Sequence, residues 1–335
     1  MSDLRINNIT DRTGDSGPVI AGVSTVSSGQ FVVPVGPTEY RGGRGRGVLG
    51  GSHPASSRMN MVEIATAANA TDFGDLSTAN YENAACASST RGVWMGGTAD
   101  NDVIDFVTIS SGGGSIATWP AGMLVGCAPW TTGFNNSTRG GCMGGAQSPS
   151  GVRTNTIQYL TIASSGNTSD FGDLTFPSRR AGASNSPTRA LYYGGTNSPA
   201  SAVNTIQYIT TATTGDAQEF GNMSTGKDIF AGCSGSTTRA IIGGGYDGSN
   251  INVIEYVTIA TLGNSVDFGD LTTQRRGGGG CSSQVRAIFM GGYTPGGTII
   301  DYITIAATGN ATDFGDLTDG SKLSDAASDV NGGLG

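Results

Sequence analysis

Histidine, charged residues and long apolar runs are all scarce in this chain, and each shortage argues against a class of protein. The only histidine, His53, lies in a Gly-Ser-His-Pro turn, so neither a histidine-based metal site nor a histidine-assisted nucleophile is expected. Charged residues make up 13% of the 335, and the net charge is −8 without a basic run, which argues against nucleic acid as a partner. No apolar stretch reaches membrane-spanning length, so membrane insertion is not expected. We therefore expect no catalytic residue set, no metal and no cofactor.

Cysteine is also sparse, and a secretory signal is missing at the start. The segment Met1–Arg5 lacks the charged and apolar regions of a signal peptide, which predicts synthesis in a reducing cytoplasm. An odd number of cysteines argues against a disulfide framework, so we expect small buried side chains with free thiols. The five are Cys86, Cys127, Cys142, Cys233 and Cys281.

Glycine is abundant, and a short sequence recurs at a regular spacing. The chain has 56 glycines, about double the usual share. Phe-Gly-Asp-Leu begins at Phe73, Phe171, Phe268 and Phe314, and an altered copy, Phe-Gly-Asn-Met, begins at Phe220. The successive steps are 98, 49, 48 and 46 residues, so one copy is missing from the first step. Six units of about fifty residues indicate a propeller or a solenoid.

Each unit carries two further signatures that predict strands. The first is Arg-Gly/Ala, three mostly apolar residues and Gly-Gly, and it begins at Arg46, Arg91, Arg139, Arg189, Arg239 and Arg286. The second runs aliphatic, acidic or amide, aromatic, aliphatic, Thr, Ile, with its aromatic at Phe106, Tyr159, Tyr208, Tyr256 and Tyr302. β-Branched and aromatic residues favour strands, so we expect four strands per unit and an all-β protein.

The two ends of the repeat array predict how the ring closes. The first unit begins at its second strand, near Arg46, and Lys322–Asn331 looks like an additional first strand. We expect this C-terminal segment to complete the first sheet, because a closed ring leaves no exposed sheet edge. Glu39–Gly43 is the alternative donor of that strand.

Units of four strands with a Gly-Gly doublet closing the second strand resemble kelch repeats. The resemblance covers about residues 41–335 and is partial, because no tryptophan recurs in the fourth strand. It implies a six-bladed kelch-like β-propeller, which is the fold we expect, with a short N-terminal β-hairpin arm.

Residues 1–40 lie outside the repeat. Two β-rich runs, 18–27 and 30–35, flank Ser28-Gly29 and predict a hairpin. A lone hairpin is marginally stable in water, so it either packs on its own propeller or anchors the chain to another protein or to further copies. The apolar residues expected to do this are Val19, Ile20, Val23, Phe31, Val32 and Val33.

The segment 6–47, followed by Ile-Asp-Tyr-Ile-Thr-Ile-Ala and Phe-Gly-Asp-Leu units, resembles structural proteins of tailed phages that infect marine cyanobacteria. Those are similar appendage or fibre proteins, and the resemblance spans essentially the whole chain. It implies a virion component that is made in the host cytoplasm and has other virion structural proteins as partners. It also implies a homo-oligomer, with a trimer as the first expectation for the oligomeric state. Tail fibre, baseplate and capsid surface all remain open, and the resemblance supplies no catalytic residues.

Candidate binding residues lie where the repeat breaks. Trp119, Trp130 and Phe134 fall at the missing copy, and aromatics of this kind are enriched in binding hot spots. The alternative is that they refill the lost contact between units. The loops after the Gly-Gly doublets vary most in length and include Tyr246 and Tyr293; these polar loops suit a host glycan or protein surface.

Two rival functions remain open. A hydrolase or lyase acting on cell-surface polysaccharide could pair carboxylates such as Asp102, Asp105 and Glu255, although Asp105 and Glu255 hold the same strand position in different units, which favours a structural role. A purely architectural decoration protein is the other. The paired aspartates of Asp-Phe-Gly-Asp could bind calcium, but capping of backbone amides is favoured.

Overall fold

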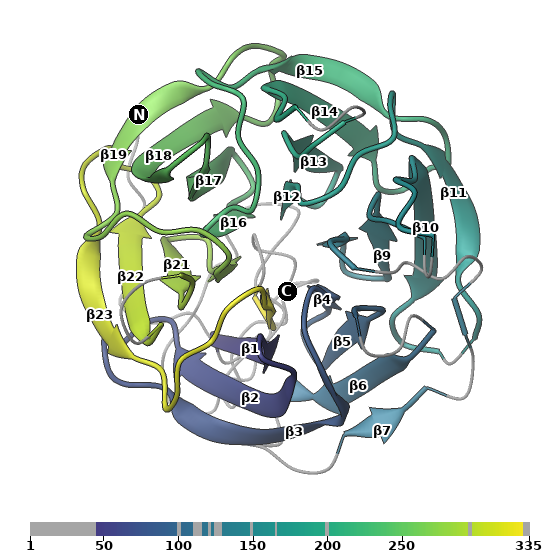
Figure 1. Ribbon diagram of the computed structural model, residues 1–335, viewed down its shortest axis with the longest axis horizontal. Helices are drawn as coiled ribbons and strands as arrows, with labels where there is room; N and C mark the ends of the chain where they lie inside the picture. The colour runs from purple at the N-terminus through teal and green to yellow at the C-terminus, as the bar shows by residue number, and fades with distance from the viewer. Residues whose placement is uncertain are drawn as a thin grey trace, which may run out of the picture. The chain divides into compact units, whose positions relative to one another are not determined.

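The computed structural model describes residues 45–330, except 99–101, 110–115, 120–121, 124–128, 148–149, 165, 198–200 and 294–296. Its described strands form six four-stranded antiparallel sheets arranged around a central axis (Figure 1). No α-helix occurs among these residues. The expectation of an all-β, six-bladed propeller is confirmed. The predicted arm, with Val19, Ile20, Val23, Phe31, Val32 and Val33, lies outside the described residues.

Each sheet runs from an innermost strand beside the axis to an outermost strand at the rim (Figure 1). The first sheet contains β24 (Asp325–Ser328), β1 (Arg46–Ser52), β2 (Ser56–Glu63) and β3 (Thr71–Asn80). The second contains β4 (Ala84–Ala87), β5 (Arg91–Met95), β6 (Ile104–Thr108) and β7 (Ala117–Thr118). The third contains β8 (Thr132–Asn135), β9 (Arg139–Met143), β10 (Thr156–Thr161) and β11 (Ser169–Asp173).

The remaining three sheets follow the same order without a break. The fourth contains β12 (Gly182–Asn185), β13 (Arg189–Tyr193), β14 (Thr205–Thr210) and β15 (Gln218–Asn222). The fifth contains β16 (Gly232–Gly235), β17 (Arg239–Tyr246), β18 (Asn250–Thr258) and β19 (Val266–Asp270). The sixth contains β20 (Gly279–Ser282), β21 (Arg286–Met290), β22 (Ile299–Thr304) and β23 (Thr312–Asp316).

The last strand of the chain closes the ring. β24 pairs antiparallel with β1, from Gly47 opposite Ser328 to Gly50 opposite Asp325, and it lies within the segment 322–331 that the sequence singled out. The first sheet is thus built from both ends of the repeat array, so the inner strands form a complete circle with no sheet left open.

The core lies between neighbouring sheets, where the Phe-Gly-Asp-Leu motif places its apolar side chains. Phe171 and Leu174 are buried, and the Phe171 ring stands edge-on to Tyr159 with centroids 5.7 Å apart. In the second sheet, which lacks the motif, Trp119 stands edge-on to Phe106 at 5.4 Å instead. The tryptophan therefore refills the contact that the missing copy would have made.

The arginine that opens each second strand joins its sheet to the next one. The Arg239 guanidinium lies 4.6 Å from the centroid of the Tyr256 ring, and its Nη1 donates to the carbonyl oxygen of Ile305 at 2.9 Å. The equivalent bond to the following sheet is made by Arg46, Arg91, Arg139, Arg189 and Arg286. In the sequence this arginine only marked the start of a predicted strand. The structure shows that it also links each sheet to the next one.

The acidic or amide residue of each third strand is a second link. Oε1 of Glu255 accepts the backbone N–H of Ser224 at 3.0 Å, and Oδ2 of Asp105 accepts that of Ser77 at 2.9 Å. Both carboxylates are buried and cap the residue that follows the Phe-Gly-Asp-Leu or Phe-Gly-Asn-Met motif of the preceding sheet. Their structural role is the one that the shared strand position favoured.

The motif glycine allows two sheets to approach closely. Gly172 has φ +142°, and a Cβ at this position would lie 2.5 Å from the carbonyl oxygen of Gly215 in the next sheet. A larger residue would meet both a strained backbone and a steric clash. This is why the glycine recurs in the motif.

The described cysteines are free, as expected: Cys86, Cys142 and Cys281 are buried and Cys233 is half-buried. Burial raises the pKa of the Cys86 thiol, which keeps it protonated and unreactive. Cys127 lies outside the described residues.

Candidate functional site

Six residues, one ahead of each innermost strand, surround one end of the central channel, and we call them the mouth ring. They are Glu82, Trp130, Arg180, Ile229, Gly277 and Leu323. Every one has a left-handed backbone, with φ between 47° and 68°. Only one is a glycine, and such a conformation is uncommon for other residues and unusual above all for a β-branched one such as Ile229. Strained backbones of this kind gather at functional sites.

A chain of backbone hydrogen bonds holds the mouth ring in this conformation. Each N–H donates to the carbonyl oxygen of the ring residue in the neighbouring sheet: Glu82 to Leu323 (2.7 Å), Leu323 to Gly277 (2.6 Å), Gly277 to Ile229 (2.9 Å), Ile229 to Arg180 (2.8 Å) and Arg180 to Trp130 (3.1 Å). Between Trp130 and Glu82 the link is a side-chain hydrogen bond from the indole to the carboxylate. The belt connects all six sheets and makes the mouth rigid.

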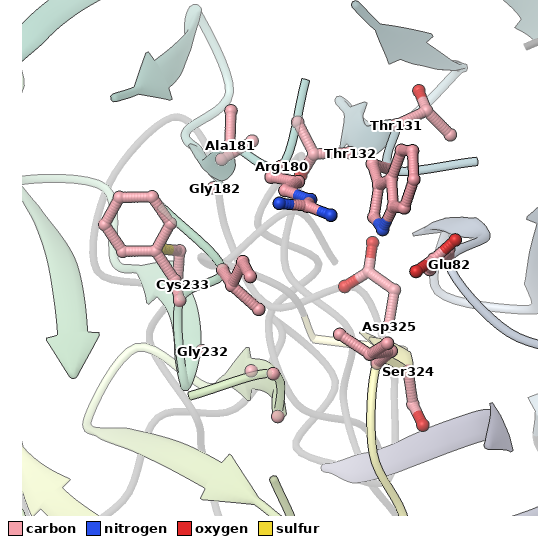
Figure 2. Close-up of a pocket in the computed structure, with 18 of the residues that line it drawn as sticks. Glu82, Thr131, Thr132, Arg180, Ala181, Gly182, Gly232, Cys233, Ser324 and Asp325 are labelled. Atoms are coloured by element: carbon pink, nitrogen blue, oxygen red, sulfur yellow. The ribbon is translucent and has the colours of Figure 1, made fainter. Parts of the chain in front are cut away.

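The mouth ring stands at the base of a hollow of about 540 Å³. The hollow shares Glu82, Trp130, Arg180, Ile229 and Leu323 with a narrower section of about 90 Å³ between the inner strands. Figure 2 shows this section, with the side chains of Glu82, Arg180 and Asp325 turned towards the middle of the channel. The hollow is of the size that holds small ligands, for which about 300–1,000 Å³ is typical.

Arginines stacked on aromatic rings form the wall of the hollow. The guanidinium groups of Arg179 and Arg180 lie 4.4 and 4.5 Å from the Trp130 ring. That of Arg276 lies 4.2 Å from the ring of Tyr246 and 5.3 Å from that of Tyr293. Cation–π contacts of this kind orient both partners. The wall therefore presents flat rings and planar cations side by side.

The charge of the lining is positive although the chain is acidic. Its basic residues are Arg153, Arg179, Arg180 and Arg276, and its carboxylates are Glu82, Asp228 and Asp247. Four of the chain's 18 basic residues thus lie at one hollow.

Burial perturbs several of these groups. It raises the pKa of Glu82, and hydrogen bonds from Thr98 and Trp130 only partly offset that effect. It also raises the pKa of Asp228, whose nearest cation is Arg180 with Nη1 4.0 Å from Oδ2. Burial, and then repulsion from Arg180 and Arg153, lower the pKa of Arg179.

A further carboxyl lies deeper in the channel. Asp325, the first residue of β24, accepts the backbone N–H of Ala85 in β4 at 2.9 Å and thereby joins the closing strand to the second sheet. Burial raises its pKa to about 6. Nearby, the amide of Asn83 is buried without a hydrogen-bond partner for either polar atom.

Three of the five aromatic candidates from the sequence meet at this hollow. Trp130, Tyr246 and Tyr293 come from different sheets and line it together. Trp119 and Phe134 do not, because they are 2% and 0% exposed between sheets. A fully packed side chain offers no surface to a partner, so these two residues are corrected to core residues.

The arginines and the carboxylates of the hollow were not among the residues predicted from the sequence. A signal was present, because a charged pair follows the Phe-Gly-Asp-Leu or Phe-Gly-Asn-Met motif in three successive units, as Arg179-Arg180, Lys227-Asp228 and Arg275-Arg276. Loop residues such as Arg153 and Asp247 carried no comparable pattern.

The rival candidates from the sequence lie elsewhere. Asp102 is exposed and Asp105 and Glu255 are within sheets, while His53 is exposed in the β1–β2 turn beside Tyr81. In the part of the chain that is described, no group of three or more His, Cys, Asp or Glu side chains could hold a metal ion. Nor does that part contain a helix with the length and apolar character needed to cross a membrane.

Comparison with known proteins supports the architecture. No family model and no curated protein matches the chain. Among solved structures, the one described as "Structure of YjhT" is similar with a TM-score of 0.66 and 12% identity, covering 81% of this chain and 94% of that one. At this identity the likeness shows the fold alone, which is the six-bladed β-propeller described above.

Proposed function

We propose that this chain is a virion appendage protein whose propeller attaches to a glycan on the host surface through the mouth of its channel. The observation that carries the proposal is the meeting of Trp130, Tyr246 and Tyr293 around a hollow of about 540 Å³. Aromatic faces pack against sugar rings, and a few placed polar groups then orient the hydroxyls.

The rigid mouth supports a binding role. Its belt of backbone hydrogen bonds fixes the position of the lining residues before any ligand arrives, and pre-organisation of this kind lowers the entropic cost of binding. Four of the loops that follow Gly-Gly doublets contribute lining residues, among them Arg153, Thr196, Tyr246 and Tyr293. Loops on a rigid scaffold are common carriers of recognition.

The virion setting and the kelch-like identity rest on the sequence. The segment 6–47 and the repeat units resemble phage appendage proteins, and the Gly-Gly doublets resemble kelch repeats. In this proposal residues 1–40 tether the propeller to the particle or to further copies of the chain, and other virion proteins are its partners. The chain forms a homo-oligomer, for which a trimer is the first oligomeric state to test.

A glycan-modifying enzyme is the second candidate. Glu82 and Asp228 line the same hollow and both have pKa values raised by burial. A carboxyl group with a raised pKa can act as a general acid on a glycosidic bond.

Purified host envelope polysaccharide separates the alternatives. We expect it to bind the chain with its length unchanged on size-exclusion chromatography, and we expect Trp130→Ala and Tyr246→Ala to weaken binding. Leu262→Ala is the matched control, because Leu262 is 58% exposed and lies outside the hollow. Shortened products that disappear in Glu82→Gln would favour the enzyme, and the absence of any binding would leave the architectural role.

Labelling of the particle tests the setting. We expect gold-conjugated antibody against the propeller to mark an appendage on intact virions in electron micrographs. If the antibody detects the protein in extracts of infected cells and not on purified virions, the virion assignment is refuted.

A further inference from the structure

The repeat carries a buried ion pair in two of its sheets and lacks it in a third. In the fifth and sixth sheets, a buried base near the end of the preceding linker pairs with the third-strand carboxylate: Lys227 with Glu255, and Arg275 with Asp301 at 3.0 Å. The counterparts in the fourth sheet are Ser178 and Gln207, because the carbonyl oxygens of Ser178, Lys227 and Arg275 each accept the N–H of the second glycine in the preceding Gly-Gly doublet. A hydroxyl and a neutral amide thus stand where the other two sheets have an ion pair.

The amide keeps the structural contact and loses the ion pair. Oε1 of Gln207 accepts the backbone N–H of Thr175 at 2.7 Å, as Glu255 and Asp301 do at their own positions. Its Nε2 is buried without a partner. Arg179, the next residue along, holds the position of Asp228 and Arg276 in the following two sheets, and all three line the hollow. It lies over Trp130 and makes no ion pair with a described residue.

Two further arginines of the hollow also lack a carboxylate partner. Among the described residues, Arg153, Arg179 and Arg276 make no ion pair, and Arg180 makes a long one to Asp228. The Nε atom of each of the four is buried without a hydrogen-bond partner. A buried donor left unpaired destabilises a structure unless something accepts from it.

We infer that the glycan bound here is anionic, and that its carboxylate or sulfate group is held between Arg153, Arg179 and Arg276. This inference rests on the proposed function and specifies its ligand. The planar guanidinium fork matches a flat or tetrahedral oxyanion, and the Trp130, Tyr246 and Tyr293 rings line the same hollow. Burial is the main cause of the lowered pKa of Arg179, and repulsion from Arg180 and Arg153 adds to it; an anion would offset that repulsion.

Isothermal titration with three oligosaccharides tests the ligand class. Oligogalacturonate carries carboxylates, its methyl ester has the same backbone without charge, and a sulfated galactan oligomer carries the other anion. We expect at least one charged oligomer to bind roughly tenfold or more tightly than the ester, with an affinity that falls as salt is raised. The stronger of the two charged oligomers identifies the anion.

Variants test the arginines. Arg179→Gln and Arg276→Gln each lower affinity for the charged oligomer roughly tenfold and lower that for the ester much less. Arg58→Gln is the matched control, because Arg58 is exposed, pairs with Asp319 and lies outside the hollow.

The outcomes separate the inference from the proposed function. If the ester and both charged oligomers bind equally well, and Trp130→Ala weakens all three, the ligand is not required to be anionic. That result overturns the inference and still supports glycan attachment. A preference for the charged oligomers that survives both Arg179→Gln and Arg276→Gln also overturns the inference. Binding to none of the three oligomers or the host polysaccharide refutes the proposed function itself.

Discussion

The two tryptophans at the break in the repeat provide the sharpest test, because the structure gives them opposite roles. Trp119 is buried between the second and third sheets, stands edge-on to Phe106, and donates from Nε1 to the carbonyl oxygen of Gly166 at 2.9 Å. Truncating a buried aromatic to alanine costs about 3–5 kcal/mol. Trp130 is half-buried and contacts mainly two arginines and Glu82, so its truncation costs about 1–2 kcal/mol.

We expect Trp119→Ala to melt on the order of 10 °C below the unaltered chain and Trp130→Ala to melt only a few degrees below it. Differential scanning calorimetry measures both, with urea unfolding as a second probe. Trp119→Phe keeps the ring and loses the bond to Gly166, so we expect an intermediate loss. A Trp119→Ala protein that melts within a degree or two of the unaltered chain, or a Trp130→Ala protein that is the less stable of the two, would refute the assignment of core and mouth.

Three further predictions concern the frame. Deleting residues 322–335 removes β24 and leaves the edge of β1 unpaired, so we expect aggregated protein on size-exclusion chromatography; a soluble, monodisperse product would contradict ring closure. Gly172→Ala should cost more than about 3 kcal/mol of unfolding free energy, from the clash with Gly215 and the φ of +142°, whereas Gly151→Ala, in open space at φ +67°, should cost about 1 kcal/mol. Because burial raises the pKa of Asp325 from 3.8 to about 6, the folded state binds the extra proton, and the unfolding free energy should fall as pH rises from about 4 to about 6; urea titrations of Asp325→Asn should lose that slope, and an unchanged slope would exclude Asp325 as its source.

The closed wheel followed from the sequence because every unit repeats its own structural chemistry. The spacing of the motif copies from Phe73 to Phe314, with its doubled first step, predicted six sheets, and the surplus strand-like segment after Leu317 indicated where the ring closes. Whether Trp119 refilled a contact or met a partner stayed open, because burial depends on the neighbouring sheet and not on local sequence. The structure decides for the refilled contact.

The mouth ring had no sequence signal of its own. Glu82, Trp130, Arg180 and Ile229 share neither charge nor shape, yet all are left-handed. Their conformation is imposed by the backbone hydrogen bonds that join each sheet to its neighbour, so side-chain identity at these positions is free to vary. Positions that the frame fixes without using the side chain are where a repeat protein can vary its binding chemistry.

The exchange at Gln207 shows how such variation leaves the frame intact. The contact that joins the sheets is the hydrogen bond from Thr175 to Oε1, and an amide oxygen accepts it as a carboxylate does. A buried ion pair contributes little net stability, because desolvation offsets most of the attraction. The fourth sheet therefore loses little by having Ser178 and Gln207 in place of a buried base and a carboxylate. The charge of the hollow is set one residue further along, where Arg179, Asp228 and Arg276 hold one position of the repeat, so the same six-sheet frame can bind ligands of different charge.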